Sequence, residues 1–198
     1  MKGKILMTAK NKIRDVSIYY FANYGYEGTS LSQIANEIGV KTPSLYAHFK
    51  SKEDIFFYCL DYALESDMEF FRRILEEHKD MHVEKTLYKL LIEYEKRLEN
   101  EVVSLFCLRT LYSPPHLFKL QLFDLTNERI FKLGELISPY FKMSKEKGNL
   151  NGIKVDEATE AYLCLFDGLI IEFMYAGSER FHYRLNAAWK VFKSGVFT

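Results

Sequence analysis

Hydroxyl and basic side chains are concentrated in one stretch of the chain, SLSQIANEIGVKTPSLYAHFKSKEDIF, which covers residues 30–56. Hydroxyls and lysine amines are groups that proteins use to bind the phosphates of a nucleic acid. Two apolar patterns of helical period occupy the stretch, one on each side of Gly39. A helix of about eight residues is unstable alone, so the rest of the chain must hold both. The apolar residues available for that purpose are Ile34, Ile38, Leu45 and Phe49.

Local signals predict where these two helices begin and end. Ser30 and Gln33 have the spacing of a capping box, in which each side chain binds a free backbone N–H of the first turn. Gly39 tolerates the left-handed backbone that ends a helix. Thr42 is predicted to cap a second helix over residues 42–49, with a proline at its first position. Two short helices joined by such a turn form a helix-turn-helix, whose second helix can enter the major groove of DNA.

Charge is distributed unevenly along the chain, although the formal net charge of all 198 residues is zero. Residues 1–52 carry eight Lys or Arg and three Asp or Glu, a net charge of +5, which leaves −5 on residues 53–198. This asymmetry predicts a basic N-terminal module that faces an anion, attached to a body with another task. The basic arm from Lys2 to Arg14 is expected to add affinity for DNA by releasing counterions, or else to be a solvated terminus.

The same stretch resembles the DNA-binding signature of the tetracycline-repressor (TetR) family of bacterial transcriptional regulators. The resemblance covers residues 10 to about 60, and beyond them it is one of layout only. It implies a homodimer in which each recognition helix, residues 42–49, reads one half-site of a palindromic DNA operator. It also implies a body that binds a small molecule, whose arrival releases the operator. The residues that carry the resemblance are Thr29-Ser30-Leu31, Ile34-Ala35, Gly39-Val40, Pro43-Ser44-Leu45-Tyr46, His48-Phe49 and Ser51-Lys52-Glu53.

The resemblance and the chemistry of the side chains together assign two sets of DNA-binding residues. Phosphate contacts are expected at the start of the first short helix and at the end of the second, from Thr29, Ser30, Tyr46, His48, Lys50 and Lys52. Base readout is expected from the exposed start and outer face of the second helix, because a lysine can donate to guanine and hydroxyls or methyls can contact other base edges. Those residues are Lys41, Thr42, Ser44 and Ala47.

Apolar residues at helical spacing continue to the C-terminus and no period of two is present, so the fold class is predicted to be all-α with about nine helices. A three-helix DNA-binding domain over residues 1–52 precedes a larger helical domain for effector binding and dimerisation over residues 53–198. Following the layout of the family, the last two helices are expected to form a four-helix bundle between subunits. The predicted helices of the larger domain cover about 53–77, 83–100, 101–112, 115–141, 155–176 and 180–194.

The larger domain holds most of the 16 Phe and 14 Tyr residues. Aromatic residues at helical spacing more often form a core than a pocket, but so many of them favour an apolar or aromatic effector. The acidic Glu172 lies in the most apolar helix, where it needs a partner: either a cationic ligand or a hydrogen bond across the dimer. The residues expected to bind the effector are Phe106, Tyr112, Phe123, Tyr162, Phe166 and Glu172.

Other chemistries lack a signature in this sequence. We find no nucleophile elbow, no H-E-x-x-H pattern and no phosphate-binding glycine loop, so neither an enzyme nor a cofactor is expected. His78 and His82 have a spacing that can share a metal ion, but no third ligand is evident and no metal is predicted. No secretory signal or membrane-spanning segment is recognised, which predicts a cytoplasmic protein without a membrane partner. The alternative is a helical small-molecule- or lipid-binding protein, or an enzyme, that does not bind DNA.

Overall fold

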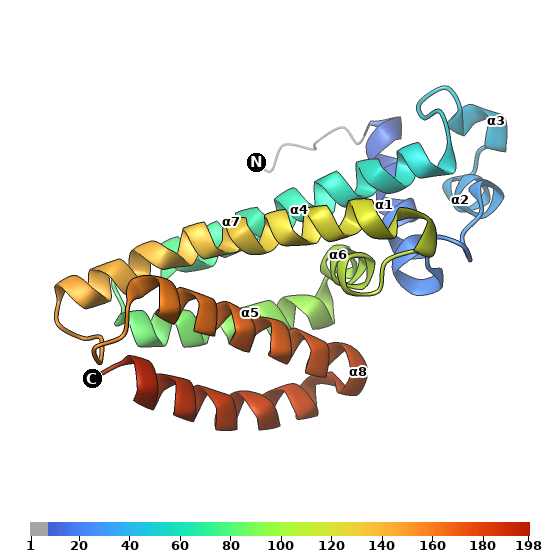
Figure 1. Ribbon diagram of the computed structural model, residues 1–198. Coiled ribbons are helices and arrows are strands. Elements are labelled where there is room, and N and C mark those ends of the chain that lie inside the picture. The colour runs from blue at the N-terminus through green and yellow to red at the C-terminus, as the bar shows by residue number, and fades with distance from the viewer. Residues whose placement is uncertain (1–7) are drawn as a thin grey trace, which may run out of the picture. The chain divides into compact units, whose positions relative to one another are not determined.

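The computed structural model describes residues 8–198, and within them the predicted all-α fold is confirmed (Figure 1). The described chain contains eight α-helices and one 3-10 helix, η1. The elements in chain order are α1 Ala9–Tyr24, α2 Leu31–Ile38, α3 Thr42–Leu45, α4 Lys52–Glu77, α5 Val83–Asn100, α6 Val102–Tyr112, η1 His116–Phe118, α7 Lys119–Glu146 and α8 Val155–Val196.

Helix α8 is two helices in practice, because Gly177 has a non-helical backbone with φ +75° and ψ −171°. A residue with a side chain is strained at such a positive φ, whereas glycine is not. Figure 1 shows α8 folding back on itself, so that its C-terminal part returns toward its start. A bond from Asn151 N to Val196 O of 3.0 Å ties the two ends together. The two predicted helices 155–176 and 180–194 correspond to these arms.

One predicted helix starts differently in the structure. Residues 115–141 were expected to form a single helix, but the segment after Pro115 begins as η1 and becomes α-helical only at Lys119, extending to Glu146. The Phe118 N–H donates to the Pro115 carbonyl at 3.0 Å, the i to i+3 pattern of a 3-10 turn.

The described chain divides into two compact units that are interleaved in sequence. One unit comprises the residues up to 67 together with 101–123, and the other comprises 68–100 together with 124–198. Helices α4 and α7 contribute to both units. Helix α6 therefore completes the core of the N-terminal unit although it lies far along the chain. The division at residue 52 expected from sequence remains a prediction about function.

An aromatic cluster forms the centre of the N-terminal unit. Phe56 of α4 packs against Phe21 of α1 and Phe106 of α6, with ring centroids 5.2 and 5.7 Å apart. Phe118 of η1 adds a stacked contact at 5.6 Å. All four rings are buried. Because each buried phenylalanine contributes about 1.5–3 kcal/mol, this cluster fixes α1 and α4 as the frame for the shorter helices.

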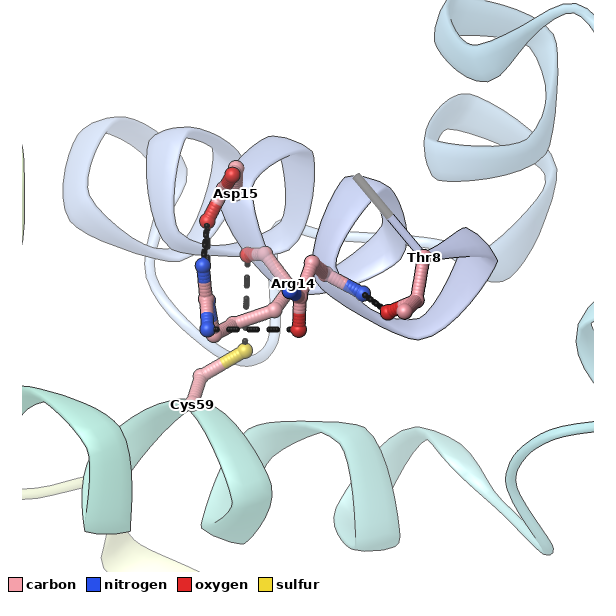
Figure 2. Close-up of polar contacts among 5 residues, drawn as sticks. Thr8, Arg14, Asp15 and Cys59 are labelled. Atoms are coloured by element: carbon pink, nitrogen blue, oxygen red, sulfur yellow. Dashed lines mark hydrogen bonds and ion pairs between the residues drawn. The ribbon is translucent and has the colours of Figure 1, made fainter. Parts of the chain in front are cut away.

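One polar contact joins α1 to α4, beside others that lie within the first part of α1 (Figure 2). Thr8 caps α1 by accepting a bond of 3.2 Å from Asn11 N. The thiol of Cys59 donates to the Arg14 carbonyl at 3.6 Å, and Arg14 pairs with Asp15 at 2.7 Å. Burial raises the pKa of the Cys59 thiol far above its usual range, so this cysteine stays protonated. Cys59 is thus a packing residue in this unit.

The second unit is a bundle of helices around a partly polar core. Phe71, Tyr94 and Phe166 pack with centroids 5.0 Å (Phe71 to Tyr94) and 5.1 Å (Tyr94 to Phe166) apart. The buried Arg129 donates to the Tyr94 hydroxyl at 2.9 Å. The hydroxyl of Tyr162 donates to the Leu87 carbonyl at 2.8 Å, and burial raises its pKa well above the usual value. Each buried phenol therefore has a hydrogen-bond partner, as burial requires.

Candidate nucleic-acid interface

Helix α2 begins at the predicted capping box. The Ser30 N–H donates to Gln33 Oε1 at 2.8 Å, and the Gln33 N–H donates to Ser30 Oγ at 3.3 Å. These bonds satisfy two donors that the first helical turn leaves free. Ile34 and Ala35 on the inner face of α2 are fully buried. An eight-residue helix is thereby held by a cap at one end and a buried face along its length.

Gly39 makes the turn between α2 and the segment that follows. Its φ of +82° and ψ of +31° are left-handed, as predicted from its place after the helix. The turn lets Val40 N donate to Ala35 O at 2.9 Å. A Cβ built on Gly39 would meet nothing within 4 Å, so the backbone angle alone requires glycine here.

Helix α3 is shorter than predicted and starts one residue earlier. Its N-cap is Lys41, without a side-chain bond, so the prediction that Thr42 caps this helix is corrected. The α-helical part ends at Leu45, and turns continue to His48. The Leu45 carbonyl accepts from both His48 N at 2.9 Å and Phe49 N at 3.0 Å. Shared acceptors of this kind are common where a helix ends, which explains why residues 42–49 do not form one regular helix.

Buried anchors on α3 and its turn set which side faces outward. Leu45 and Phe49 are buried, with 1% and 4% of their surface exposed. The residues between and around them point to solvent, and Tyr46 is 57% exposed. The side chains of these outward residues, which are named in the next sentence, have no hydrogen bond or ion pair within residues 8–198, so they are available to a partner. The exposed members are Lys41, Ser44, Tyr46, Ala47, His48 and Lys50, and Thr42 is half-buried.

Two residues assigned to phosphate from the sequence, Thr29 and Lys52, make hydrogen bonds within the protein. The Thr29 hydroxyl donates to the Gly25 carbonyl at 2.7 Å and the residue is 2% exposed. Lys52 Nζ donates to the carbonyls of Tyr26 at 2.7 Å and Thr29 at 2.9 Å. Burial lowers the pKa of Lys52, and the carboxylate of Glu27 acts in the opposite direction. Both side chains stabilise the loop before α2, so a phosphate would have to compete with these bonds.

Two basic residues of α1 also make contacts within the N-terminal unit. Lys12 Nζ donates to the Ile38 carbonyl at 3.0 Å and so closes the C-terminal end of α2. The ammonium of Lys10 lies 4.8 Å from the centroid of the Tyr58 ring. The sequence signal for both was only a cluster of lysines, which does not distinguish a structural lysine from a DNA ligand. Lys2 and Lys4 of the predicted arm lie outside the described residues.

The six residues expected to bind an effector divide between the two units. Phe106, Tyr112 and Phe123 belong to the N-terminal unit, whereas the other three belong to the second unit. Phe106 lies in the aromatic core described above, and Tyr162 and Phe166 are buried in the core of the second unit. These three side chains behave as the core residues that aromatic spacing more often predicts.

Glu172 finds partners that sequence reasoning did not consider. Its carboxylate is 3.0 Å from Arg180 Nε and 3.1 Å from Arg184 Nη2, both on the second arm of α8. The acid in the apolar helix is therefore neutralised within its own chain, across the Gly177 break. A contact of Glu172 with a cationic ligand or across a dimer stays a prediction.

Metal-binding groups do not cluster in the described part of the chain. Residues 8–198 contain no group of three or more His, Cys, Asp or Glu placed to hold a metal ion. One ring nitrogen of His78, Nδ1, is 2.9 Å from the Ile74 carbonyl. A nitrogen that donates to a carbonyl cannot bind a metal at the same time.

Comparison with known proteins finds a family model and relatives that are similar to this segment. Residues 13–59, which contain α2, the Gly39 turn and α3, match the family model described as "Bacterial regulatory proteins, tetR family". The chain is 28% identical over 142 residues to the biofilm operon icaADBC HTH-type negative transcriptional regulator IcaR of Staphylococcus aureus, which covers 70% of this chain and 72% of IcaR.

Solved structures share the fold over nearly the whole length. A TetR transcriptional regulator from Chloroflexus aurantiacus superimposes with a TM-score of 0.79 at 19% identity, covering 95% of this chain and 96% of the other. SmeT, the repressor of the Stenotrophomonas maltophilia multidrug efflux pump SmeDEF, gives 0.73 at 16% identity, covering 96% and 91%. In its matched DNA-binding segment, its relatives and its fold, the chain is similar to the tetR family of bacterial regulatory proteins, which supports a DNA-binding transcriptional regulator.

Proposed function

We propose that the protein is a repressor that binds a palindromic operator as a homodimer and leaves it when a small molecule binds. The observation that carries the proposal is the outward face of the α3 segment, by which we mean residues 41–50. Exposed lysine, hydroxyl and imidazole groups there surround two buried residues, Leu45 and Phe49. IcaR is named as a negative regulator and SmeT as a repressor, which supports repression rather than activation. The protein acts in the cytoplasm and catalyses no reaction.

In this proposal the DNA contacts fall into two sets. Lys41, Thr42, Ser44 and Ala47 read base edges, because they occupy the exposed start and outer face of α3. Ser30, Tyr46, His48 and Lys50 bind phosphates around them. Thr29 and Lys52 contribute mainly by fixing the loop before α2, given their bonds to internal carbonyls.

Dimerisation is assigned to both arms of α8. Only 28% of the most apolar window of this helix is buried, although by length and composition alone it could cross a membrane. Large apolar side chains stand exposed on it, among them Tyr175 at 77% and Val191 at 74%. Exposed small residues, Ala161 and Gly168, would let a second helix approach closely. An apolar face of this kind is what a contact between subunits needs.

The proposal is tested by titrating salt against DNA binding. Fluorescence anisotropy with the DNA upstream of the protein's own coding region should show tight binding that weakens steeply as salt rises. Each phosphate neutralised contributes a slope of about 0.9 in log affinity per log unit of salt, and a dimer should neutralise several. An unrelated duplex of equal length is the control, and it should bind more weakly at every salt concentration.

The competing possibility is a helical small-molecule- or lipid-binding protein, or an enzyme, that does not bind DNA. It predicts no operator complex even at low salt. Absence of binding to any duplex at low ionic strength would overturn the repressor assignment.

A further inference from the structure

A groove lies between α5 and the second arm of α8, and none of its lining residues is among those named above for DNA binding or for the subunit contact. It lies wholly within the second unit and has a volume of about 480 Å³. Pockets of about 300–1,000 Å³ are typical of small-molecule sites. Its lining residues are Met81, Glu84, Lys85, Tyr88, Lys89, Asn186, Trp189, Lys190 and Lys193.

Aromatic rings make the floor of this groove. Trp189 and Tyr88 pack against each other with ring centroids 5.3 Å apart, and Trp189 is backed by Phe192 at 5.4 Å. Only 8% of the Trp189 surface is exposed, so the ring is held in place by its surroundings. An apolar or flat ligand body can lie on such a floor without rearranging it.

The rim of the groove is strongly cationic. Four lysines line it against one acid, Glu84, and the acid is already paired with Lys193 at 2.6 Å. Lys89 is paired outside the groove, with Glu93 at 3.0 Å. The side chains of Lys85 on α5 and Lys190 on α8 have no ion pair within residues 8–198. They stand on the two helices that form the groove and leave its charge uncompensated.

We infer that this groove binds a small amphipathic anion, with the apolar body on Tyr88 and Trp189 and the anionic group between Lys85 and Lys190. The two unpaired lysines attract an anion. Contact between the apolar body of the ligand and the two aromatic rings removes apolar surface from water, which favours binding. The ligand class is a carboxylate, or a similar anion, attached to an alkyl or aromatic body. If the proposed regulation holds, this groove is where an effector of that class acts, but binding itself does not depend on that proposal.

The chain offers a direct probe of this groove, because Trp189 is its single tryptophan. Decanoate, at concentrations too low to form micelles, is titrated into the full chain without DNA while Trp189 fluorescence is recorded. Decan-1-ol, of the same chain length but uncharged, is titrated in parallel. The structure predicts a saturable change with decanoate and binding of decan-1-ol weaker by about tenfold, since two charge-assisted contacts are missing.

Substitution of the two lysines tests whether they bind the anionic group of the ligand. Lys85→Gln with Lys190→Gln should weaken decanoate binding about tenfold and leave decan-1-ol binding unchanged. Lys142→Gln, an exposed lysine of α7 outside the groove, should change neither. Circular dichroism and thermal melting confirm that each variant is folded.

Three results would overturn the inference. One is the lack of a saturable Trp189 response to decanoate up to about 1 mM, the weakest affinity that a specific site would show. Another is equal affinity for decanoate and decan-1-ol. The third is a double Lys85 and Lys190 variant that binds decanoate as the parent does. Because DNA is absent throughout, these results are separate from any failure of operator binding.

Discussion

The lysines of the N-terminal unit fall into two groups, those bonded within the protein and those exposed to solvent, and the sequence alone does not separate them. Lys12 and Lys52 donate to carbonyls at the end of α2 and in the loop before it. Lys41 and Lys50 are exposed, and their side chains bind nothing within residues 8–198. The first group determines stability and the second is free to determine DNA affinity.

Tyr46 offers a test of one exposed group. Replacing Tyr46 by Phe removes a hydroxyl that has no partner in the described chain, so the free energy of unfolding should not change. If the hydroxyl binds a phosphate, affinity for every DNA sequence should fall about fivefold. Anisotropy titration measures this. Tyr24→Phe is a matched control, because Tyr24 is 56% exposed and Tyr46 is 57% exposed. If the two variants bind DNA with equal affinity, the Tyr46 hydroxyl does not contact DNA.

Lys50 and Lys52 form a second matched pair, two residues apart in sequence. Lys52→Ala leaves two carbonyls of the Tyr26–Thr29 loop without their donor, so the free energy of unfolding should fall by about 1–3 kcal/mol. Lys50→Ala should change stability by less than about 0.5 kcal/mol but lower the salt slope of DNA binding by about 1.8, which is about 0.9 for each subunit of the dimer. Urea unfolding and salt titration give both quantities. The opposite pattern would show that the two lysines have been assigned the wrong roles.

At the scale of elements, α2 and α3 are too short to be stable without their caps, turn and buried anchors. The α2 capping box joins Ser30 and Gln33, and α3 is held through Leu45. The backbone of Gly39 sets the direction in which α3 leaves α2. A change in that turn therefore acts on both helices together.

Gly39→Ala should lower the free energy of unfolding by about 1 kcal/mol, because an alanine is disfavoured at φ +82° although its Cβ would meet no atom within 4 Å. DNA affinity should fall as well if the turn directs α3. Gly195→Ala is the control: that glycine is helical and open, so its replacement should cost nothing. Chemical denaturation of both variants is the measurement. A Gly39 variant as stable as the parent would mean that the turn relaxes at no cost.

Sequence patterns were sufficient to predict the position of most helices, because capping residues, glycines and the spacing of apolar residues act locally. The Ser30 and Gln33 box, the left-handed Gly39 and the exact bounds of α5 were predictable in this way. The end of α3 at Leu45 was not, since it depends on how one carbonyl is shared. The partners of Phe106 in the core were not predictable either, because α6 joins the N-terminal unit through contacts distant in sequence.

The same distinction applies to the candidate site. Which residues of α3 face outward follows from the two buried anchors, Leu45 and Phe49, whose apolar character is visible in the sequence. The internal bonds of Lys52 depend on a loop that lies more than twenty residues away, at Tyr26 and Thr29. Composition could not reveal those bonds, nor the pairing of Glu172 across the break in α8.

At the scale of the whole molecule, the proposed homodimer would present two copies of the DNA-binding segment to one operator, and we propose that α8 joins the two subunits. Tyr175→Arg places a charge on the exposed apolar face of α8 that we propose as the subunit contact, once in each subunit. The dimer dissociation constant should rise about a hundredfold, equivalent to about 3 kcal/mol. Analytical ultracentrifugation measures it.

Leu120→Arg is the matched control for this change, because Leu120 is 80% exposed and Tyr175 is 77% exposed, but Leu120 lies on α7. It should leave the dimer intact. Loss of the dimer in the Leu120 variant alone would move the subunit contact away from α8.

The central claim, that the outer face of the α3 segment reads a duplex twice in a symmetric pair, is tested most directly by selecting bound sequences from a pool of random DNA. The parent protein should enrich an inverted repeat whose half-sites are about 34 Å apart, or a multiple of that distance. Lys41→Ala and Ser44→Ala should each enrich a repeat with altered bases but unchanged spacing. Enrichment of no sequence, of a single half-site, or of the same bases by all three proteins would contradict the account.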